Sequence, residues 1–308
     1  MLIHGFDPRY IKMCYFATLA DLGYRTRVSL ANGTEPSSPL ADDLHVSFEA
    51  FSPQGVRLGS VDSFEVLPPG GFTIVDVDDH VGPGRAIESD GSDVLGIFHM
   101  TPGRFVGLDC VDIELSAIFD QVAVSDEYIE YHSSEWSVAA GLAYQSIPMN
   151  DKRFGGTRST LMQSPKLLVD EQNDTHLVLL NVSTSPDYEL DISFQLAFMA
   201  ANGERLANHT VRVPAYGFAR VSSREVLKAA RGFQRFCELG GNGMVVGFSD
   251  NGSVVPLSIT RNDRSKGLAC DHTLPPMYYL PWWGGEVRKA ANQRLREIMF
   301  SGASGSPQ

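Results

Sequence analysis

The sequence has few cysteines, no long apolar run and no excess of positive charge. Its four cysteines are Cys14, Cys110, Cys237 and Cys270, and they lack the Cys-x-x-Cys spacing of a structural zinc site. No segment approaches the roughly 18 consecutive apolar residues that a membrane-spanning helix needs. The formal net charge of −12 disfavours binding to nucleic acids and anionic membranes, so we expect neither as a partner.

Established catalytic motifs are absent as well. The sequence contains no Gly-x-Ser-x-Gly, His-Glu-x-x-His or Walker A pattern, and no Gly-x-Gly-x-x-Gly follows a strand-like segment. These absences argue against the common hydrolase and nucleotide-binding classes, and we expect no cofactor. Glycosidases stay open, because two carboxylates far apart in sequence suffice for their chemistry.

The N-terminal residues lack the features of a secretory leader. No basic segment precedes the apolar residues, and Asp7, Pro8 and Arg9 interrupt them. We therefore expect a cytoplasmic protein, or a secreted one if its N-terminus is processed. Asn-x-Ser/Thr triplets begin at Asn32, Asn173, Asn181, Asn208 and Asn251. We interpret them as turns, because these side chains hydrogen-bond to nearby backbone.

An internal repeat is the most prominent feature. In residues 27–51 and again in 177–198, a short apolar strand ends at an asparagine (Asn32 and Asn181), and a turn rich in serine and proline leads to a strand of alternating apolar residues. Further matches lie about 150 residues apart. They are 52–58 with 200–206, 64–77 with 211–223, 93–98 with 244–248, and 124–131 with 269–276.

This repeat predicts a mainly β protein made of two tandem domains. Short strands, frequent turns and proline-marked corners are typical of immunoglobulin-like antiparallel β-sandwiches. We expect the first domain in residues 1–150, with its core in 27–131. The second is expected in 151–300, with its core in 177–276.

Helix is expected in only two places. Ser222 and Glu225 form a capping box that predicts a short helix over 222–230. Residues 286–300 place apolar side chains on one face, which predicts an amphipathic C-terminal helix. The small, polar residues 301–308 are expected to be disordered, and 9–22 are ambiguous between strand and helix.

Three segments carry residues suited to binding or chemistry. The first is the glycine-rich stretch after Asn150, where Arg153 and Arg158 stand in an otherwise acidic protein. Backbone amides and arginines of this kind bind anions. The alternative is a solvated hairpin tip.

The second segment is Asp-Val-Asp-Asp-His at 76–80. In a strand, Asp76, Asp78 and His80 would point to one side and could hold a divalent ion. The alternative is the charged end of an edge strand, which blocks edge-to-edge aggregation. We assign no metal here and keep the site as the alternative.

The third segment, residues 125–136, combines carboxylates with Tyr128 and Trp136. Glu130 and Glu135 could act as acid and base on a sugar, and aromatic rings stack on pyranose faces. The alternative is an acidic strand that places Tyr128 and Trp136 in the core.

Residues 269–285 are rich in proline and aromatic residues. Asp271 aligns with Asp126 of the first repeat, which favours a structural role, whereas His272 has no counterpart there. The aromatic residues are Tyr278, Tyr279, Trp282 and Trp283. They form either a plug over the core or a shelf that binds a sugar or aromatic ligand.

These features favour a non-catalytic protein that binds a glycan or a protein partner. The alternative is a carbohydrate-active enzyme in which Glu130, Glu135, Asp271 and His272 meet at the domain interface. A third possibility is assembly into a homo-oligomer through the C-terminal helix.

Overall fold

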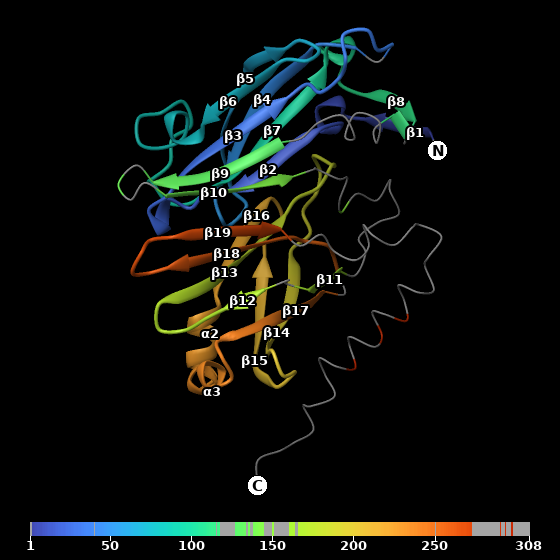
Figure 1. Ribbon diagram of the computed structural model, residues 1–308. Coiled ribbons are helices and arrows are strands. Elements are labelled where there is room, and N and C mark those ends of the chain that lie inside the picture. The colour runs from blue at the N-terminus through green and yellow to red at the C-terminus, as the bar shows by residue number, and fades with distance from the viewer. Residues whose placement is uncertain are drawn as a thin grey trace. The chain divides into compact units, whose positions relative to one another are not determined.

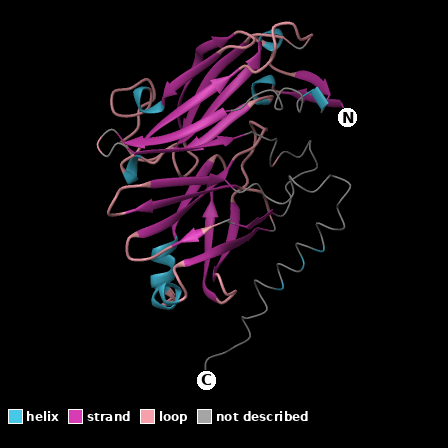
Figure 2. Cartoon of the chain, viewed as in Figure 1, coloured by secondary structure: helices cyan, strands magenta, loops and turns pink. Residues whose placement is uncertain are grey.

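The computed structural model describes most of the chain. The described residues are 2–39, 41–114, 127–133, 138–144, 160–163, 166–249 and 251–272, with the isolated positions 116, 117, 135, 150, 290, 293 and 297. Antiparallel sheets dominate this part of the chain, as Figure 2 shows, and two α-helices accompany them. The predicted mainly β, antiparallel fold is therefore confirmed.

The chain divides into two compact units. The first comprises 1–156, 182–190 and 214–218, and the second comprises 157–181, 191–213 and 219–308. The first unit thus includes two loops from the second half of the sequence. In one of them, Tyr216 stacks on Phe51 with 5.2 Å between ring centroids, and its hydroxyl donates to the Ser185 carbonyl at 2.5 Å.

The first unit contains two four-stranded sheets and a small two-stranded one. One sheet has the order β10-β9-β3-β6, the second has the order β2-β7-β4-β5, and β1 pairs with β8 (Figure 1). The strands are β1 (Leu2–Phe6), β2 (Met13–Ala17), β3 (Arg25–Ala31), β4 (Leu44–Phe51), β5 (Arg57–Leu67), β6 (Phe72–Asp76), β7 (Leu95–Pro102), β8 (Val111–Glu114), β9 (Glu127–Ser133) and β10 (Val138–Tyr144).

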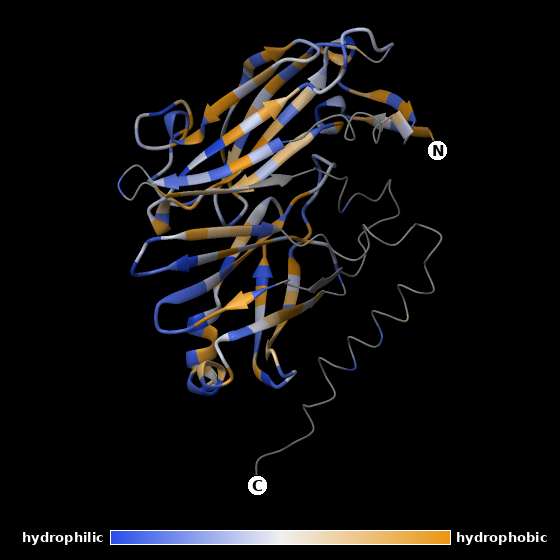
Figure 3. Ribbon diagram, in the orientation of Figure 1, coloured by the Kyte–Doolittle hydropathy of each residue, from blue (hydrophilic) through white to orange (hydrophobic). Residues whose placement is uncertain are grey.

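Alternation along the strands builds the core of this unit. On β3, Thr26, Val28 and Leu30 are buried and the residues between them face outward, a pattern visible as coloured bands in Figure 3. On the other sheet, Phe48 stacks on Phe98 with 4.5 Å between ring centroids. Burial of such rings is the main favourable contribution to this fold.

The second unit also contains two main sheets. They have the orders β16-β13-β18-β19 and β11-β17-β14-β15, and β12 pairs with β17 beside them. The strands are β11 (Thr160–Gln163), β12 (Leu167–Leu168), β13 (Asn173–Asn181), β14 (Ile192–Ala200), β15 (Arg205–Val213), β16 (Gly217–Ser222), β17 (Asn242–Ser249), β18 (Val255–Asn262) and β19 (Leu268–His272).

Helices follow β16 in this unit. The predicted capping residue is correct: the Ser222 hydroxyl accepts from the Glu225 backbone N–H at 3.1 Å, and α2 spans Ser223–Ala229. A second helix, α3 (Phe233–Glu238), was not anticipated from the sequence. Leu227 and Phe236 anchor the two helices in the core of the unit.

The two units have matching strand orders. The order β6-β3-β9-β10 matches β16-β13-β18-β19, and β5-β4-β7-β2 matches β15-β14-β17-β11. Among the described strands, β1, β8 and β12 have no counterpart in this match. The asparagines at the ends of β3 and β13 also act alike. Asn32 Nδ2 donates to the Leu67 carbonyl at 3.0 Å, and Asn181 Nδ2 donates to the Val213 carbonyl at 3.0 Å. Both carbonyls belong to the last residue of a strand that a proline follows.

The strand orders correct one part of the sequence alignment. Residues 124–131 were matched to 269–276, but β9 is the counterpart of β18, and β10 is the counterpart of β19. The error arose because both segments place an aspartate in a strand-like context. Asp126 lies outside the described residues, so its equivalence with Asp271 stays a prediction.

Other local expectations also change. Strand β6 ends at Asp76 and continues as a short 3-10 helix, Val77–Asp79, so the 76–80 segment does not alternate as a strand. Within the ambiguous 9–22 segment, 3-10 turns at Pro8–Tyr10 and Ala20–Leu22 flank β2. Tyr128 lies on the surface and not in the core.

Several predictions lie outside the described residues. They are the loop arginines Arg153 and Arg158, the aromatic residues Trp136, Tyr278, Tyr279, Trp282 and Trp283, and the tail 301–308. The predicted helix over 286–300 also lies outside them, except for Ala290, Gln293 and Glu297, which are helical.

Candidate functional site

The outer face of the sheet β6-β3-β9-β10 brings two predicted motifs together. Arg27 on β3 pairs in register with Asp76 on β6 and with Glu130 on β9. Glu130 in turn pairs with Gly141 on β10, so the four residues form one row across the sheet. Asp76 and Glu130 come from the two acidic segments of the first half, which the sequence could not join.

Arg27 links the two carboxylates. Its Nε lies 3.3 Å from Asp76 Oδ1, and its Nη1 lies 3.4 Å from Glu130 Oε1. His132, two residues along β9, lies 3.7 Å from Glu130 Oε1 and 3.9 Å from Asp76 Oδ1. The row therefore presents alternating acceptors and donors that are partly open to solvent.

The remaining acids of 76–80 are engaged by the start of β3. Asp78 accepts from the Thr26 backbone N–H at 2.9 Å, and Asp79 accepts from Arg25 at 3.1 Å. His80 packs edge-on against Phe64. Among the described residues, no group of three or more His, Cys, Asp or Glu side chains could hold a metal ion. The metal alternative at Asp76, Asp78 and His80 thus has no geometric support there.

Next to the charged row, Tyr128 lies against the sheet. A Cβ built on Gly141 would fall 2.5 Å from the Tyr128 Cζ atom, so the ring occupies the space above this glycine. The side chain is 42% exposed. An aromatic ring laid over a strand glycine stabilises the sheet, and it also offers one face to a ligand.

Two further apolar side chains extend this face on the edge strand β6. Phe72 is 72% exposed and Ile74 is 56% exposed. Ile74 pairs with Ser29, which pairs with Tyr128 on its other side, so a small residue separates two larger ones. We call the outward residues Phe72, Ile74, Tyr128, Asp76, Arg27, Glu130 and His132 the Tyr128 face.

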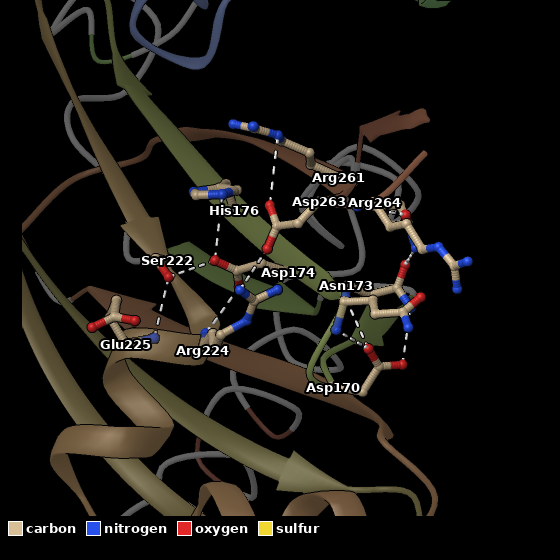
Figure 4. Close-up of polar contacts among 12 residues, drawn as sticks. Asp170, Asn173, Asp174, His176, Ser222, Arg224, Glu225, Arg261, Asp263 and Arg264 are labelled. Atoms are coloured by element: carbon tan, nitrogen blue, oxygen red, sulfur yellow. Dashed lines mark hydrogen bonds and ion pairs between the residues drawn. The ribbon is translucent and has the colours of Figure 1, made fainter. Parts of the chain in front are cut away.

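The second unit has a polar cluster at the corresponding end of its sheet (Figure 4). Asp174 on β13 accepts from the Ser222 hydroxyl at 2.6 Å and from the Arg224 backbone N–H at 2.9 Å, and His176 Nε2 lies 3.3 Å away. Arg224 also donates to Asp263 at 2.7 Å, and Arg261 lies 3.7 Å from that carboxylate. These bonds tie β13, α2 and the end of β18 together.

Serine, aspartate and histidine here do not form a nucleophilic triad. In such a triad the histidine lies between the other two groups and takes the serine proton, whereas here the carboxylate lies between them. Ser222 is also the N-cap of α2. Burial lowers the pKa of His176, and the nearby Asp174 carboxylate only partly offsets this. We interpret the cluster as structural.

The residues of the predicted enzyme site lie in different units. Glu130 on β9 and the exposed Glu135 after β9 belong to the first unit. Asp271, which is exposed, and the last residue of β19, His272, belong to the second. Glu130 contacts Arg27 and lies 3.7 Å from His132, neither of which was placed in that site. A site formed by all four residues stays a prediction.

A groove of about 570 Å³ lies elsewhere in the first unit. Its floor comes from β4 and β7, and its walls come from β5, the Pro8–Tyr10 turn and the loop after β7. Sequence reasoning assigned none of its residues to a site. The loop Phe-Val-Gly-Leu-Asp at 105–109, apolar and unlike its surroundings, was the available signal.

No family model and no curated protein matches the sequence. Solved structures that resemble the chain are a glycosyl hydrolase family 2 member from Bacteroides cellulosilyticus DSM 14838 (8% identity, TM-score 0.18), a beta-glucuronidase from glycoside hydrolase family 2 (9%, 0.15) and a putative beta-galactosidase from Bacteroides fragilis (9%, 0.17). The alignments cover 84%, 87% and 87% of this chain but 27%, 25% and 35% of those chains.

With TM-scores this low, the function of the chain has to be argued from its own residues. The described part of the chain contains no helix that is long and apolar enough to span a membrane.

Proposed function

We propose that the protein binds a glycan on the Tyr128 face without transforming it. The observation that carries the proposal is the Tyr128 ring, which lies over Gly141 and beside the Asp76–Arg27–Glu130 row. Sugars present an apolar C–H face and a rim of hydroxyls. A flat aromatic ring beside fixed donors and acceptors is complementary to both.

The spacing of the face suits a ligand longer than one sugar ring. Ile74 and Tyr128 lie two strands apart, which is about 10 Å between backbones. Phe72 lies one pleat further along β6. A linear glycan lying across the strands would contact the apolar residues and the charged row together.

The same geometry argues against catalysis on this face. Acid–base chemistry on a glycosidic bond gains from exclusion of water, and this sheet face is open to solvent. Arg27 donates to both carboxylates, so neither is a free acid poised over a substrate. Binding therefore explains these residues better than hydrolysis does.

A glycan array followed by titration calorimetry with the strongest hit tests the proposal. We expect Tyr128→Ala to weaken binding at least tenfold and Glu130→Gln to weaken it severalfold. Tyr128→Phe should bind like the wild type, because it keeps the ring. Val56→Ala, at an exposed position off this face, is the matched control.

Two outcomes would overturn the proposal. The first is a folded protein that binds no glycan on the array, or whose binding survives Tyr128→Ala. The second is turnover of a glycoside substrate that Glu130→Gln abolishes, which would favour the enzyme alternative. Circular dichroism of each variant verifies that the fold is intact.

We further propose that the two units are copies of one immunoglobulin-like sandwich domain, with a boundary near residue 150. Matching strand orders and the matching hydrogen bonds of Asn32 and Asn181 support this. An experimentally determined structure tests it by superposition of 27–144 on 177–272. Failure of the counterpart strands to superpose would refute it.

A further inference from the structure

We propose that the groove in the first unit docks a short basic and apolar segment of a protein partner. This is a second binding function, independent of the Tyr128 face. The groove has a volume of about 570 Å³, a size suited to several side chains. All its lining residues belong to the first unit.

One wall of the groove is apolar and well anchored. Phe105, Val106 and Leu108 form it, and the latter two are 48% and 50% exposed. The Gly103 backbone N–H donates to the Asp43 carbonyl at 2.7 Å, which fixes the turn that begins this loop. Large apolar side chains exposed on an anchored loop are typical of contact surfaces.

Neighbouring charges hold the same wall in place. Arg104 donates from its backbone and its guanidinium to Asp42, at 3.1 and 3.3 Å. The guanidinium carbon also lies 4.8 Å from the centroid of the Phe105 ring. The wall is thus set before a ligand arrives, which reduces the entropic cost of binding.

The part of the groove that β5 lines is acidic. Asp62 and Glu65 are exposed on β5, and Asp109 lies at the end of the apolar loop. None of these three carboxylates forms an ion pair with a basic side chain in the described part of the chain. Asp7 differs, because Arg9 donates to both of its oxygens.

The groove therefore carries three carboxylates without an ion pair among the described residues, beside an apolar wall: two lie on β5, and Asp109 ends the apolar loop itself. A peptide segment that alternates lysine or arginine with leucine-like residues matches both sides. In an extended segment, alternate side chains point in opposite directions, so one side reaches the acids and the other the apolar wall. His45, Ser47 and Thr101 on the floor supply polar contacts for its backbone.

Fluorescence anisotropy with labelled nine-residue peptides tests this inference on the full chain. We expect an alternating leucine–lysine peptide to bind, and leucine–glutamate and serine–lysine peptides to bind at least tenfold more weakly. The double variant Asp62→Asn/Glu65→Gln keeps the shape of the acidic wall and should weaken binding about tenfold. The double variant Val106→Ser/Leu108→Ser removes apolar surface from the other wall and should also weaken binding about tenfold.

Asp90→Asn is the matched control, because Asp90 is an exposed acid outside the groove. It should leave the affinity unchanged. Equal binding of the lysine and glutamate peptides would overturn the inference, and so would equal binding by wild type and both double variants. Weakening by Asp90→Asn as large as that by the groove variants would also overturn it, because attraction to the net negative chain would then suffice.

Discussion

The two units share a strand order but carry opposite charges at one corner. In the first, β3 supplies Arg25 and Arg27, and the acids come from β6, the turn after it and β9. In the second, β13 supplies Asp174 and His176 at the corresponding end, and the arginines come from α2 and β18. Both sheets place complementary charges at this corner, but the strand that carries each sign differs between the two units.

The outer faces of the corresponding sheets differ as well. The pair Ser29–Tyr128 in the first unit corresponds to Val178–Leu257 in the second. Tyr128 is 42% exposed, whereas Val178 and Leu257 are buried. The inner-face pattern is kept and the outer face has diverged, so the proposed glycan site belongs to the first unit alone.

The largest expected effect comes from one hairpin glycine. Gly55 has a positive φ of 80°, and a Cβ there would collide with the Ala215 carbonyl. Gly203, in the matching hairpin, has φ of 86° and nothing within 4 Å. Gly55→Ala should cost about 3 kcal/mol and Gly203→Ala about 1 kcal/mol, since both incur backbone strain but only the first a clash.

Urea unfolding followed by circular dichroism measures both glycine variants. Equal losses in the free energy of unfolding would show that the 214–218 loop moves aside with no energetic penalty. The two hairpins would then be equivalent in energy as well as in shape.

The second prediction concerns the paired asparagines, which should behave alike. Asn32→Ala and Asn181→Ala each remove a buried donor to the last carbonyl of a strand. Each should cost about 2 kcal/mol, because the carbonyl loses its partner away from water. Hydrogen exchange with mass spectrometry would locate each loss in its own unit. Asn208→Ala is the exposed control, and a loss confined to one of the two buried sites would contradict their equivalence.

The two units should lose stability at different pH values on acidification. Burial lowers the pKa of His176 below 6.5, so the unfolded state takes up the proton first. The stability that neutral His176 contributes to the folded state is fully present above pH 6.5. It is lost as the pH falls below that value. Burial raises the pKa of Glu49, but His99 and Arg57 outweigh it and bring the value from 4.5 to about 2. That contribution, about 2 kcal/mol after allowance for solvent screening, is lost between pH 4.5 and 2.

The second unit should therefore weaken first on acidification, and the first unit below pH 4.5. Unfolding free energies measured from pH 8 to 3 check the order. His176→Gln should flatten the profile just below pH 6.5, and Glu49→Gln should flatten it below pH 4.5. The reverse assignment would show that other groups control acid stability.

The smallest expected effect is at α2, the helix that follows β16. Ser222→Ala removes the N-cap of α2 and a donor to Asp174, and should cost about 1 kcal/mol. Ser222→Thr keeps the hydroxyl and should stay within a few tenths of the wild type. Differential scanning calorimetry compares the two variants. A loss in Ser222→Thr as large as that in Ser222→Ala would rule out the cap as the cause.

Many strands, hairpins and helix ends were predictable because they depend on local sequence patterns. Period-two alternation along β14, the glycine hairpins at 52–58 and 200–206, and the serine cap of α2 each follow from neighbouring residues. The match of 124–131 with 269–276 failed because a short strand-like segment with an aspartate occurs in both places. Only the hydrogen-bonding partners of β9 and β19 tell them apart.

The candidate site was predictable only in pieces. The acidic segments that contain Asp76 and Glu130 stood out in sequence, but nothing there indicated that Arg27 would lie between them. Tyr128 alternates with residues of the core face, yet strand alternation alone cannot say which face is covered. The groove was missed because its residues come from five separate segments of the first unit.

The sequence by itself determined the β composition, the hairpins and the repeated pattern, because these depend on side-chain periodicity and turn chemistry within a few residues. Tertiary structure decided which strands pair, and with them the Asp76–Arg27–Glu130 row, the position of Tyr128 over Gly141, and the pairing of an apolar with an acidic wall in the groove. The physical reason is that register between distant strands is set by the packing of the whole core, which no single segment encodes.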